Sequence, residues 1–135
     1  MGENDLLRLV PYTLAPRPLP ADRSLPGPRY DLLKVQKRVV GGESIFLVTE
    51  KCRQDVLALR WTNAEVAEVL HALEHQHYRN SSWCETGVGR AVDCDAYAID
   101  FDIRSLIPSP SGTDLYVKFG FTMLGKPLLI ISCHS

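Results

Sequence analysis

The chain has 135 residues and a formal net charge of −1, so it is long enough for one domain with a buried core but has no overall positive charge to attract nucleic acid. No apolar run approaches the roughly 20 residues that cross a bilayer, and we expect no contact with a membrane. The N-terminal stretch "MGENDLLRLVPYTL" has no basic segment followed by a long apolar one, so a secretory signal is not expected. Four cysteines without a C-x-x-C pair indicate reduced thiols in a cytoplasmic protein.

Proline dominates the first part of the chain. Residues 11–28 read "PYTLAPRPLPADRSLPGP" and hold six of the nine prolines. Proline fixes φ and removes a backbone donor, so we expect an extended N-terminal arm over residues 1–28 that either lies along the domain or moves freely. The folded domain is then expected over residues 29–135.

Helical signals follow the arm. Asp31 can cap a helix with Leu32, Val35 and Val39 on one face, which the pair Gly41-Gly42 ends. A short strand in "ESIFLV" and a helix in "TEKCRQDVLAL" come next. Thr62 and Glu65 then form a capping box for a third helix, whose expected inner face is Val66, Val69, Leu70, Leu73 and His77.

The second half of the chain is β-like. The segment "NSSWCETGVGR" is expected to end the third helix as a loop, and "DCDAYAIDF" to form a strand. "LYVKFGF" alternates apolar and other residues, and "PLLIISCH" is apolar on both faces, which is typical of a central strand. These elements predict an α+β fold, with N-terminal helices packed on a small antiparallel sheet.

The stretch "HALEHQHYRN" contains His-x-x-Glu-His, the pattern of inverted zinc peptidases. His71 and His75 are one helical turn apart and can in principle share a metal ion. On a helix whose inner face is Val66, Leu70 and Leu73, however, both histidines point outward. We therefore expect no metal site, although zinc content would be the test of a peptidase.

From about Tyr30 to His134 the ordered segments resemble the MqsR (motility quorum-sensing regulator) toxins, ribonucleases with a fold related to the RelE toxins. The segments are "YDLLKVQKRVVGG", "DVLALRWTNAEVAEVLHALEHQHYRNS", "DAYAIDFD", "LYVKF" and "LLIISCH". The arm lies outside this resemblance. The resemblance implies a RelE-like ribonuclease toxin fold, mRNA as substrate, a cognate antitoxin as partner, and no metal or cofactor.

The same resemblance implies where the reaction would occur. Such toxins use the ribose 2′-hydroxyl to attack the adjacent phosphorus, which requires a proton acceptor, a cation for the phosphorane and a proton donor. Arg79 stands where the family has a lysine, Cys94 where it has a glutamine, and His134 where it has the closing lysine, while Tyr116 and Lys118 are retained. We expect Arg79, Tyr116 and His134 to be catalytic and Tyr78, Cys94 and Lys118 to bind substrate, with Lys118 or His77 sharing the acid–base role.

The altered positions leave a second interpretation open, namely an MqsR-like binding module without nuclease activity. RNA binding depends mainly on phosphate contacts, and the overall charge supplies none. A local basic patch would be needed, for which the candidates are Arg79, Arg90, Arg104, Lys118 and Lys126.

Overall fold

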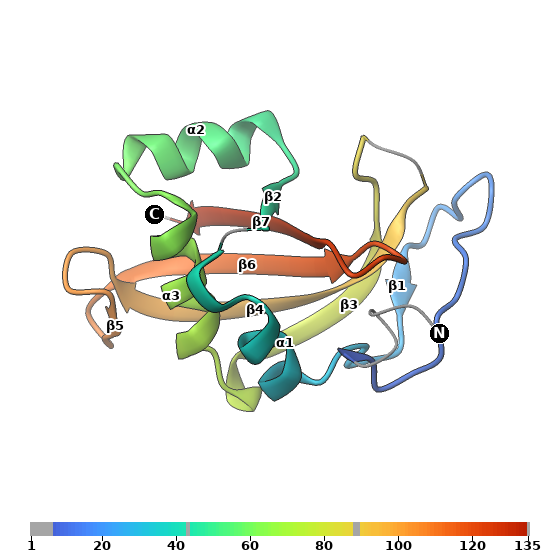
Figure 1. Cartoon of the computed structure of the whole chain (residues 1–135), viewed down its shortest axis with the longest axis horizontal. Coiled ribbons are helices and arrows are strands. Elements are labelled where there is room, and N and C mark those ends of the chain that lie inside the picture. Colours follow the sequence, from blue (N-terminus) through green and yellow to red (C-terminus); the bar gives the residue numbers. More distant parts are fainter. Residues whose placement is uncertain (1–6, 43, 88–89, 135) are drawn as a thin grey trace.

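The computed structural model describes residues 7–42, 44–87 and 90–134, with the backbone alone at Cys133 and His134. Within these residues the chain forms three α-helices and a seven-stranded sheet (Figure 1). The expectation of a mixed α and β fold is confirmed. The expected order, helices first and then strands, is wrong in detail because β1 (Ser24–Leu25) precedes the first helix. The short strand expected in "ESIFLV" is confirmed as β2 (Phe46–Leu47), between the first and second helices.

Each of the three helices begins at a capping residue, and two of these caps, Asp31 and Thr62, were predicted from the sequence. In α1 (Leu32–Arg38) the Asp31 carboxylate accepts hydrogen bonds from the backbone N–H groups of Leu33 and Lys34. Thr49 caps α2 (Glu50–Ala58) in the same way. The capping box of Thr62 and Glu65 is present at the start of α3 (Asn63–Ala72), as predicted.

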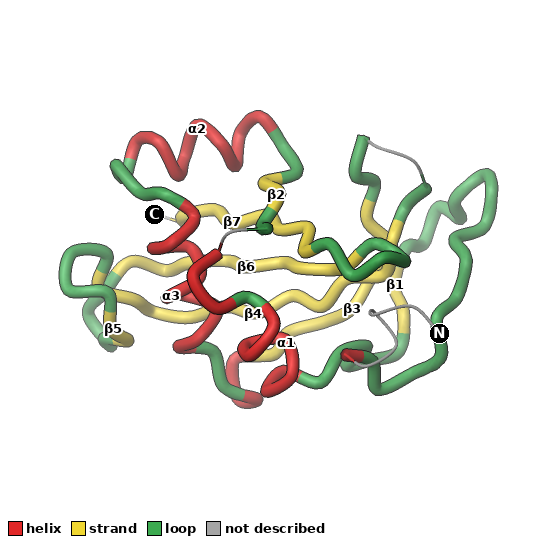
Figure 2. The backbone as a smooth tube through the Cα atoms, in the orientation of Figure 1, coloured by secondary structure: helices red, strands yellow, loops and turns green. Residues whose placement is uncertain are grey.

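The sheet has the strand order β1-β3-β4-β6-β7-β2, with β5 (Ile107–Pro108) paired to β4 outside this path (Figure 2). The long strands are β3 (Tyr78–Cys84), β4 (Val92–Asp102), β6 (Thr113–Phe121) and β7 (Pro127–His134). Among the described strands, the pairings are antiparallel except that of β2 with β7, which is parallel. The expected antiparallel sheet is therefore a mixed one.

The main core lies between the helices and one face of the sheet. Val35 from α1, and Val66 and Leu70 from α3, pack in one cluster with the inward side chains of β4 and β6. The inward residues of β6 are Leu115, Val117, Phe119 and Phe121, as their alternation predicts. The other face of the sheet carries Tyr116 and Lys118, both half-buried, and we call it the open face.

Two expected boundaries around α3 differ from those observed. Leu73 has extended backbone angles, so the helix ends at Ala72 and His77 belongs to a separate 3-10 turn, His75–His77. The following residues, expected to form a loop, make strand β3. Their polarity concealed a strand that pairs with a neighbour on each side and buries Ser81 and Trp83.

The described part of the proline-rich arm lies along the domain. Strand β1, within the arm, pairs with β3 and forms one edge of the sheet. Leu7 is buried in the main core, and the Arg8 guanidinium forms a buried ion pair with Asp93. The arm and β5 lie at opposite ends of the molecule (Figure 1). Of the helices described, none has the length and apolar character to cross a bilayer.

Candidate functional site

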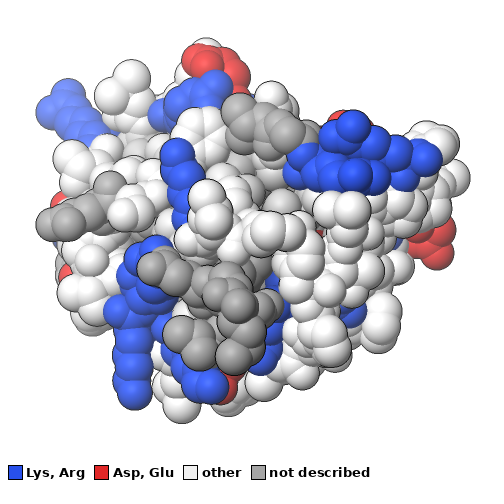
Figure 3. Space-filling model, turned by 45° about the vertical axis from the view of Figure 1, so that its right-hand side comes forward, with Lys and Arg blue, Asp and Glu red and all other residues white. Residues whose placement is uncertain are grey.

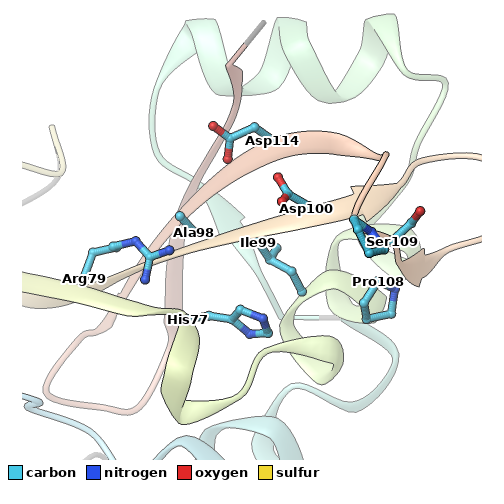
Figure 4. A pocket seen from close by; sticks show the side chains of 9 residues that line it. His77, Arg79, Ala98, Ile99, Asp100, Pro108, Ser109 and Asp114 are labelled. Atoms are coloured by element: carbon cyan, nitrogen blue, oxygen red, sulfur yellow. The ribbon is translucent and has the colours of Figure 1, made fainter.

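A groove of about 360 Å³ opens where the start of β3 meets β4, β6 and the β5 segment. Its lining comprises His77, Arg79, Ala98, Ile99, Asp100, Pro108, Ser109, Pro110 and Asp114. Figure 4 shows the Arg79 guanidinium and the His77 ring on one side of this groove. The carboxylates of Asp100 and Asp114 lie on the other side. The groove therefore combines a fixed cation, an imidazole and two acids.

Arg79 reaches the groove because the strand is irregular at this residue. Tyr78 pairs with Tyr97 and Asn80 with Ala96, so the register shifts at Arg79. The guanidinium is exposed and uses one nitrogen for two backbone carbonyls, Gln76 O at 3.3 Å and Tyr78 O at 3.2 Å. Arg79 thus retains donors that can bind an anion in the groove.

His77 is held in one orientation by its own turn. Its Nδ1 accepts a hydrogen bond from the Glu74 backbone N–H at 2.9 Å. A neutral His77 ring must then carry its proton on Nε2. The ring is half-buried and lines the groove, so this imidazole can exchange protons with a bound molecule.

Asp100 and Asp114 meet because of the pairing between β4 and β6, in which they are directly opposite each other. Both line the groove and both are exposed. One guanidinium against two carboxylates gives the groove a formal charge of −1 when His77 is neutral. Neither acid was among the site residues expected from the sequence.

Tyr116 and His134 extend this surface over the next two strands. Tyr116 is opposite Ala98, a groove residue, on one side and opposite Ser132 on the other. The backbone of His134 pairs with Asp114, whereas its side chain lies outside the described structure. The structure therefore brings Arg79 and Tyr116 to one surface and places the His134 backbone beside it.

Cys94 and Lys118 lie together at the other end of the open face, with Cys84 as a third member. Cys94 is buried in a second apolar cluster with Cys84, Val92 and Leu128. A hydrogen bond from Cys94 and the nearby Lys118 ammonium lower the pKa of Cys84 to about 6, against the opposing effect of burial. The same bond and burial raise the pKa of Cys94. Cys84 was not selected from sequence, because its segment was expected to be a loop.

Tyr78 is not part of the groove. Its ring packs edge-on against Tyr97 with centroids 5.7 Å apart, and its hydroxyl is hydrogen-bonded to Ser81 Oγ at 2.7 Å. Tyr97 faces the main core, so Tyr78 lies on the opposite side of the sheet from Tyr116. The structure thus separates this residue from the others expected to bind substrate.

The histidines of the zinc-like pattern do not share a helix. His71 is on α3 and donates from Nε2 to Gln36 O at 2.8 Å, whereas His75 lies on the separate 3-10 turn. Over residues 7–42, 44–87 and 90–134, no group of three His, Cys, Asp or Glu side chains is placed to hold a metal ion.

Positive side chains gather away from the groove rather than in it. In Figure 3, the charged residues of the visible face are mainly Lys and Arg, and acidic residues lie mainly at its outline. Lys34, Lys37 and Arg38 line one hollow, and Arg17 and Arg90 line another beside the arm. Among the five basic residues considered from sequence, Arg79 alone lines the groove itself.

No protein-family model, curated protein or solved structure matches the chain. The similarity to MqsR and RelE toxins, and with it a RelE-like fold, therefore enters the functional interpretation as a proposal.

Proposed function

We propose that this chain is the toxin of a bacterial type II toxin–antitoxin pair, a cytoplasmic endoribonuclease that cleaves mRNA without a metal and is blocked by a cognate antitoxin. One observation carries the proposal. Arg79 and His77 border a single groove on the open face of the sheet, and Tyr116 adjoins it. These residues can supply the phosphate-binding cation and the proton donors that this reaction needs.

Each group has a separate task. The 2′-oxygen of a ribose attacks the adjacent phosphorus, and the bond to the next 5′-oxygen breaks, leaving a 2′,3′-cyclic phosphate. Arg79 binds the phosphorane oxygens through paired N–H groups. Tyr116 donates its hydroxyl hydrogen to a phosphate oxygen. His77 takes up a second proton when Nδ1 releases the Glu74 N–H, and then transfers a proton from Nε2 to the departing 5′-oxygen. His134, from the end of β7, is a second candidate for the proton-transfer role.

Asp100 and Asp114 can supply the proton acceptor that the reaction also needs. Asp100 or Asp114 can accept the proton of the 2′-hydroxyl, because an ionised carboxylate in hydrogen-bond reach serves as a general base. Their negative charges also oppose phosphate binding. Replacing one acid with asparagine should tighten RNA binding in both cases but stop cleavage only for the acid that is the base.

The negative groove also favours a second candidate, a binding module of the same ancestry without nuclease activity. A formal charge of −1 in the groove disfavours phosphate binding, and Cys94 is buried away from the groove. Both observations argue against a nuclease site inherited from such a toxin. Expression in bacteria distinguishes the two candidates. Growth arrest that Tyr116→Phe or His77→Asn abolishes supports the nuclease.

The direct test incubates the purified chain with mRNA in the presence of a chelator and identifies the new 3′ ends. We expect cyclic phosphate ends from the wild type and a rate about 100-fold lower for Arg79→Gln, since one transition-state donor contributes about that much. Arg79→Lys should recover part of the rate, because it keeps charge without the paired geometry. Arg53→Gln, on the surface of α2, is the matched control and should cut like wild type. Folded wild type that leaves RNA intact would overturn the nuclease proposal.

A further inference from the structure

The second apolar cluster places two thiols side by side on the open face. Ser82 pairs with Cys94 and Cys84 pairs with Val92, so the two cysteines are diagonal neighbours on antiparallel strands. Both are free, and their side chains are hydrogen-bonded to each other. Two thiols in contact can close a disulfide if their backbones approach slightly.

The surroundings give the two sulfur atoms different roles. Lys118, on β6 at the far side of β4, and Ser82, on β3 itself, both interact with the Cys84 sulfur, which stabilises a thiolate at that position. Cys94 keeps its proton, since its interaction with Cys84 and its burial both raise its pKa, and its Sγ also lies 3.9 Å from the Val92 carbonyl oxygen. A reactive thiolate beside a protonated partner is the arrangement of a peroxide-sensitive cysteine and its resolving cysteine.

The fold also makes room for the second thiol. A Cβ atom at Gly120 would lie 2.8 Å from Cys94 Sγ and 2.8 Å from the Asp93 carbonyl oxygen. Any side chain at this position would therefore displace the sulfur. The apolar neighbours Val92, Leu128 and Phe46 surround the pair, so that small neutral oxidants are the reagents suited to reach it.

We propose that Cys84 and Cys94 form a redox-active pair that hydroperoxides oxidise to a disulfide between β3 and β4. The Cys84 thiolate attacks one peroxide oxygen, the O–O bond breaks, and the alkoxide or hydroxide released takes up a proton. The sulfur, oxidised by two electrons, becomes a sulfenic acid. Cys94 then attacks this sulfur, the S–O bond breaks, and water leaves with the Cys94 proton. One peroxide and two thiols thus give one disulfide, one alcohol or water, and one further water.

Trypsin provides a direct readout, because cleavage after Arg79, Arg90 and Arg104 places Cys84 and Cys94 on separate peptides, residues 80–90 and 91–104. The reduced full-length chain is treated with one equivalent of hydrogen peroxide and digested without reductant, and the peptide masses are measured by mass spectrometry. We expect the two peptides to be joined with the loss of two hydrogens. Cys84→Ser and Cys94→Ser should each abolish that species, while Cys52→Ala, at a buried thiol in the main core, should leave it unchanged.

Alkylation of the reduced protein tests the mechanism separately from disulfide geometry. Modification of Cys84 by iodoacetamide should reach half its maximal rate near pH 6, the pKa that its neighbours produce. Lys118→Met should lower the rate at pH 6 by about fivefold, since a pKa raised by one unit, from about 6 to about 7, reduces the thiolate fraction at pH 6 by that factor. The proposal is overturned if peroxide leaves the peptides unlinked in a protein that remains folded, or if Cys84 reacts only above pH 8.

Discussion

Arg8 and Asp93 are 85 residues apart in the chain and form a two-pronged ion pair that fastens the N-terminal arm to the sheet. Both side chains are almost fully buried, at 2% and 1% exposure. Asp93 also accepts hydrogen bonds from Arg29 Nε at 2.8 Å and the Tyr30 hydroxyl at 3.3 Å. One carboxylate thus joins the arm, the approach to α1 and strand β4.

Breaking this pair should destabilise the protein strongly. Arg8→Met leaves the Asp93 carboxylate with one cation in a buried site, and we expect unfolding to become easier by about 3 kcal/mol. Urea denaturation followed by tryptophan fluorescence measures the change. Arg23→Met is the control, because its pair with Glu85 is solvent-exposed and should contribute less than about 1 kcal/mol. Equal effects of the two variants would contradict this account of the arm.

Asp93 and Asp95 should give the stability of the fold opposite dependences on pH. Burial tends to raise the pKa of Asp93, but hydrogen bonds and charge from Arg8 and Arg29 outweigh it and bring the pKa below the ordinary 3.8. The contribution of ionised Asp93 to folding stability is therefore complete above about pH 3.8. It is lost as the pH falls through the pKa that Asp93 has in the folded state. Asp95 has its pKa raised, mainly by burial, although it accepts hydrogen bonds from Ser81 and two backbone N–H groups.

A raised carboxyl pKa means that the folded state holds its proton to higher pH than the unfolded state. Stability should fall as the pH rises from about 3.8 through the folded pKa of Asp95. Asp95→Asn should remove this decline, and Asp93→Asn should reduce the loss below pH 3.8, whatever the overall stability of each variant. Urea midpoints from pH 3 to pH 7 provide the two slopes. Unchanged slopes would show that these acids do not control the titration.

Local signals explain how much of the fold could be predicted from sequence. The bonds between Thr62 and Glu65 join residues three apart, so the start of α3 was visible in the sequence alone. Strand β3 was missed because its polar residues are stabilised by distant partners, such as Asp95, which accepts from Ser81 Oγ at 2.6 Å. The parallel pairing of β2 with β7 likewise depends on contacts that no local pattern encodes.

In the candidate site, too, some residues could be predicted from the sequence, whereas others depend on distant strand pairing. Arg79 and Tyr116 were expected from the resemblance, and the structure brings them to one surface. Asp100 and Asp114 were missed because their meeting depends on the register of β4 against β6. Recognising β3 as a strand would have indicated the Cys84–Cys94 pair, since a hairpin of β3 and β4 puts both thiols on one face.

Gly120 provides a test of packing around the thiol pair. A methyl group there would approach Cys94 Sγ and the Asp93 carbonyl oxygen within 2.8 Å, so Gly120→Ala should cost about 1–3 kcal/mol. Combining it with Cys94→Ala removes one of the two close contacts. The double variant should therefore be more stable than the sum of the single effects predicts. Strict additivity in urea denaturation would contradict the contact.

His77 allows its structural and chemical roles to be separated. In His77→Asn the amide oxygen can still accept from Glu74 N–H, so the turn should survive while the Nε2 proton is lost. We expect a near-normal urea midpoint and RNA cleavage at least 100-fold slower, the usual cost of losing a proton-transfer group. His77→Gln should lower stability by about 1 kcal/mol instead, since it removes the turn acceptor. Wild-type cleavage by His77→Asn would remove His77 from the proposed mechanism.

The pairing of β1 with β3 has a consequence for any shortened form of the protein. Without residues 1–28, the backbone donors and acceptors of β3 that face β1 would become an uncovered margin of the sheet. Unprotected margins of this kind template pairing between molecules, and loss of Arg8 would at the same time leave Asp93 short of a counter-charge. We expect such a truncated chain to aggregate. By covering the edge of β3, the proline-rich arm would then prevent self-association of the protein.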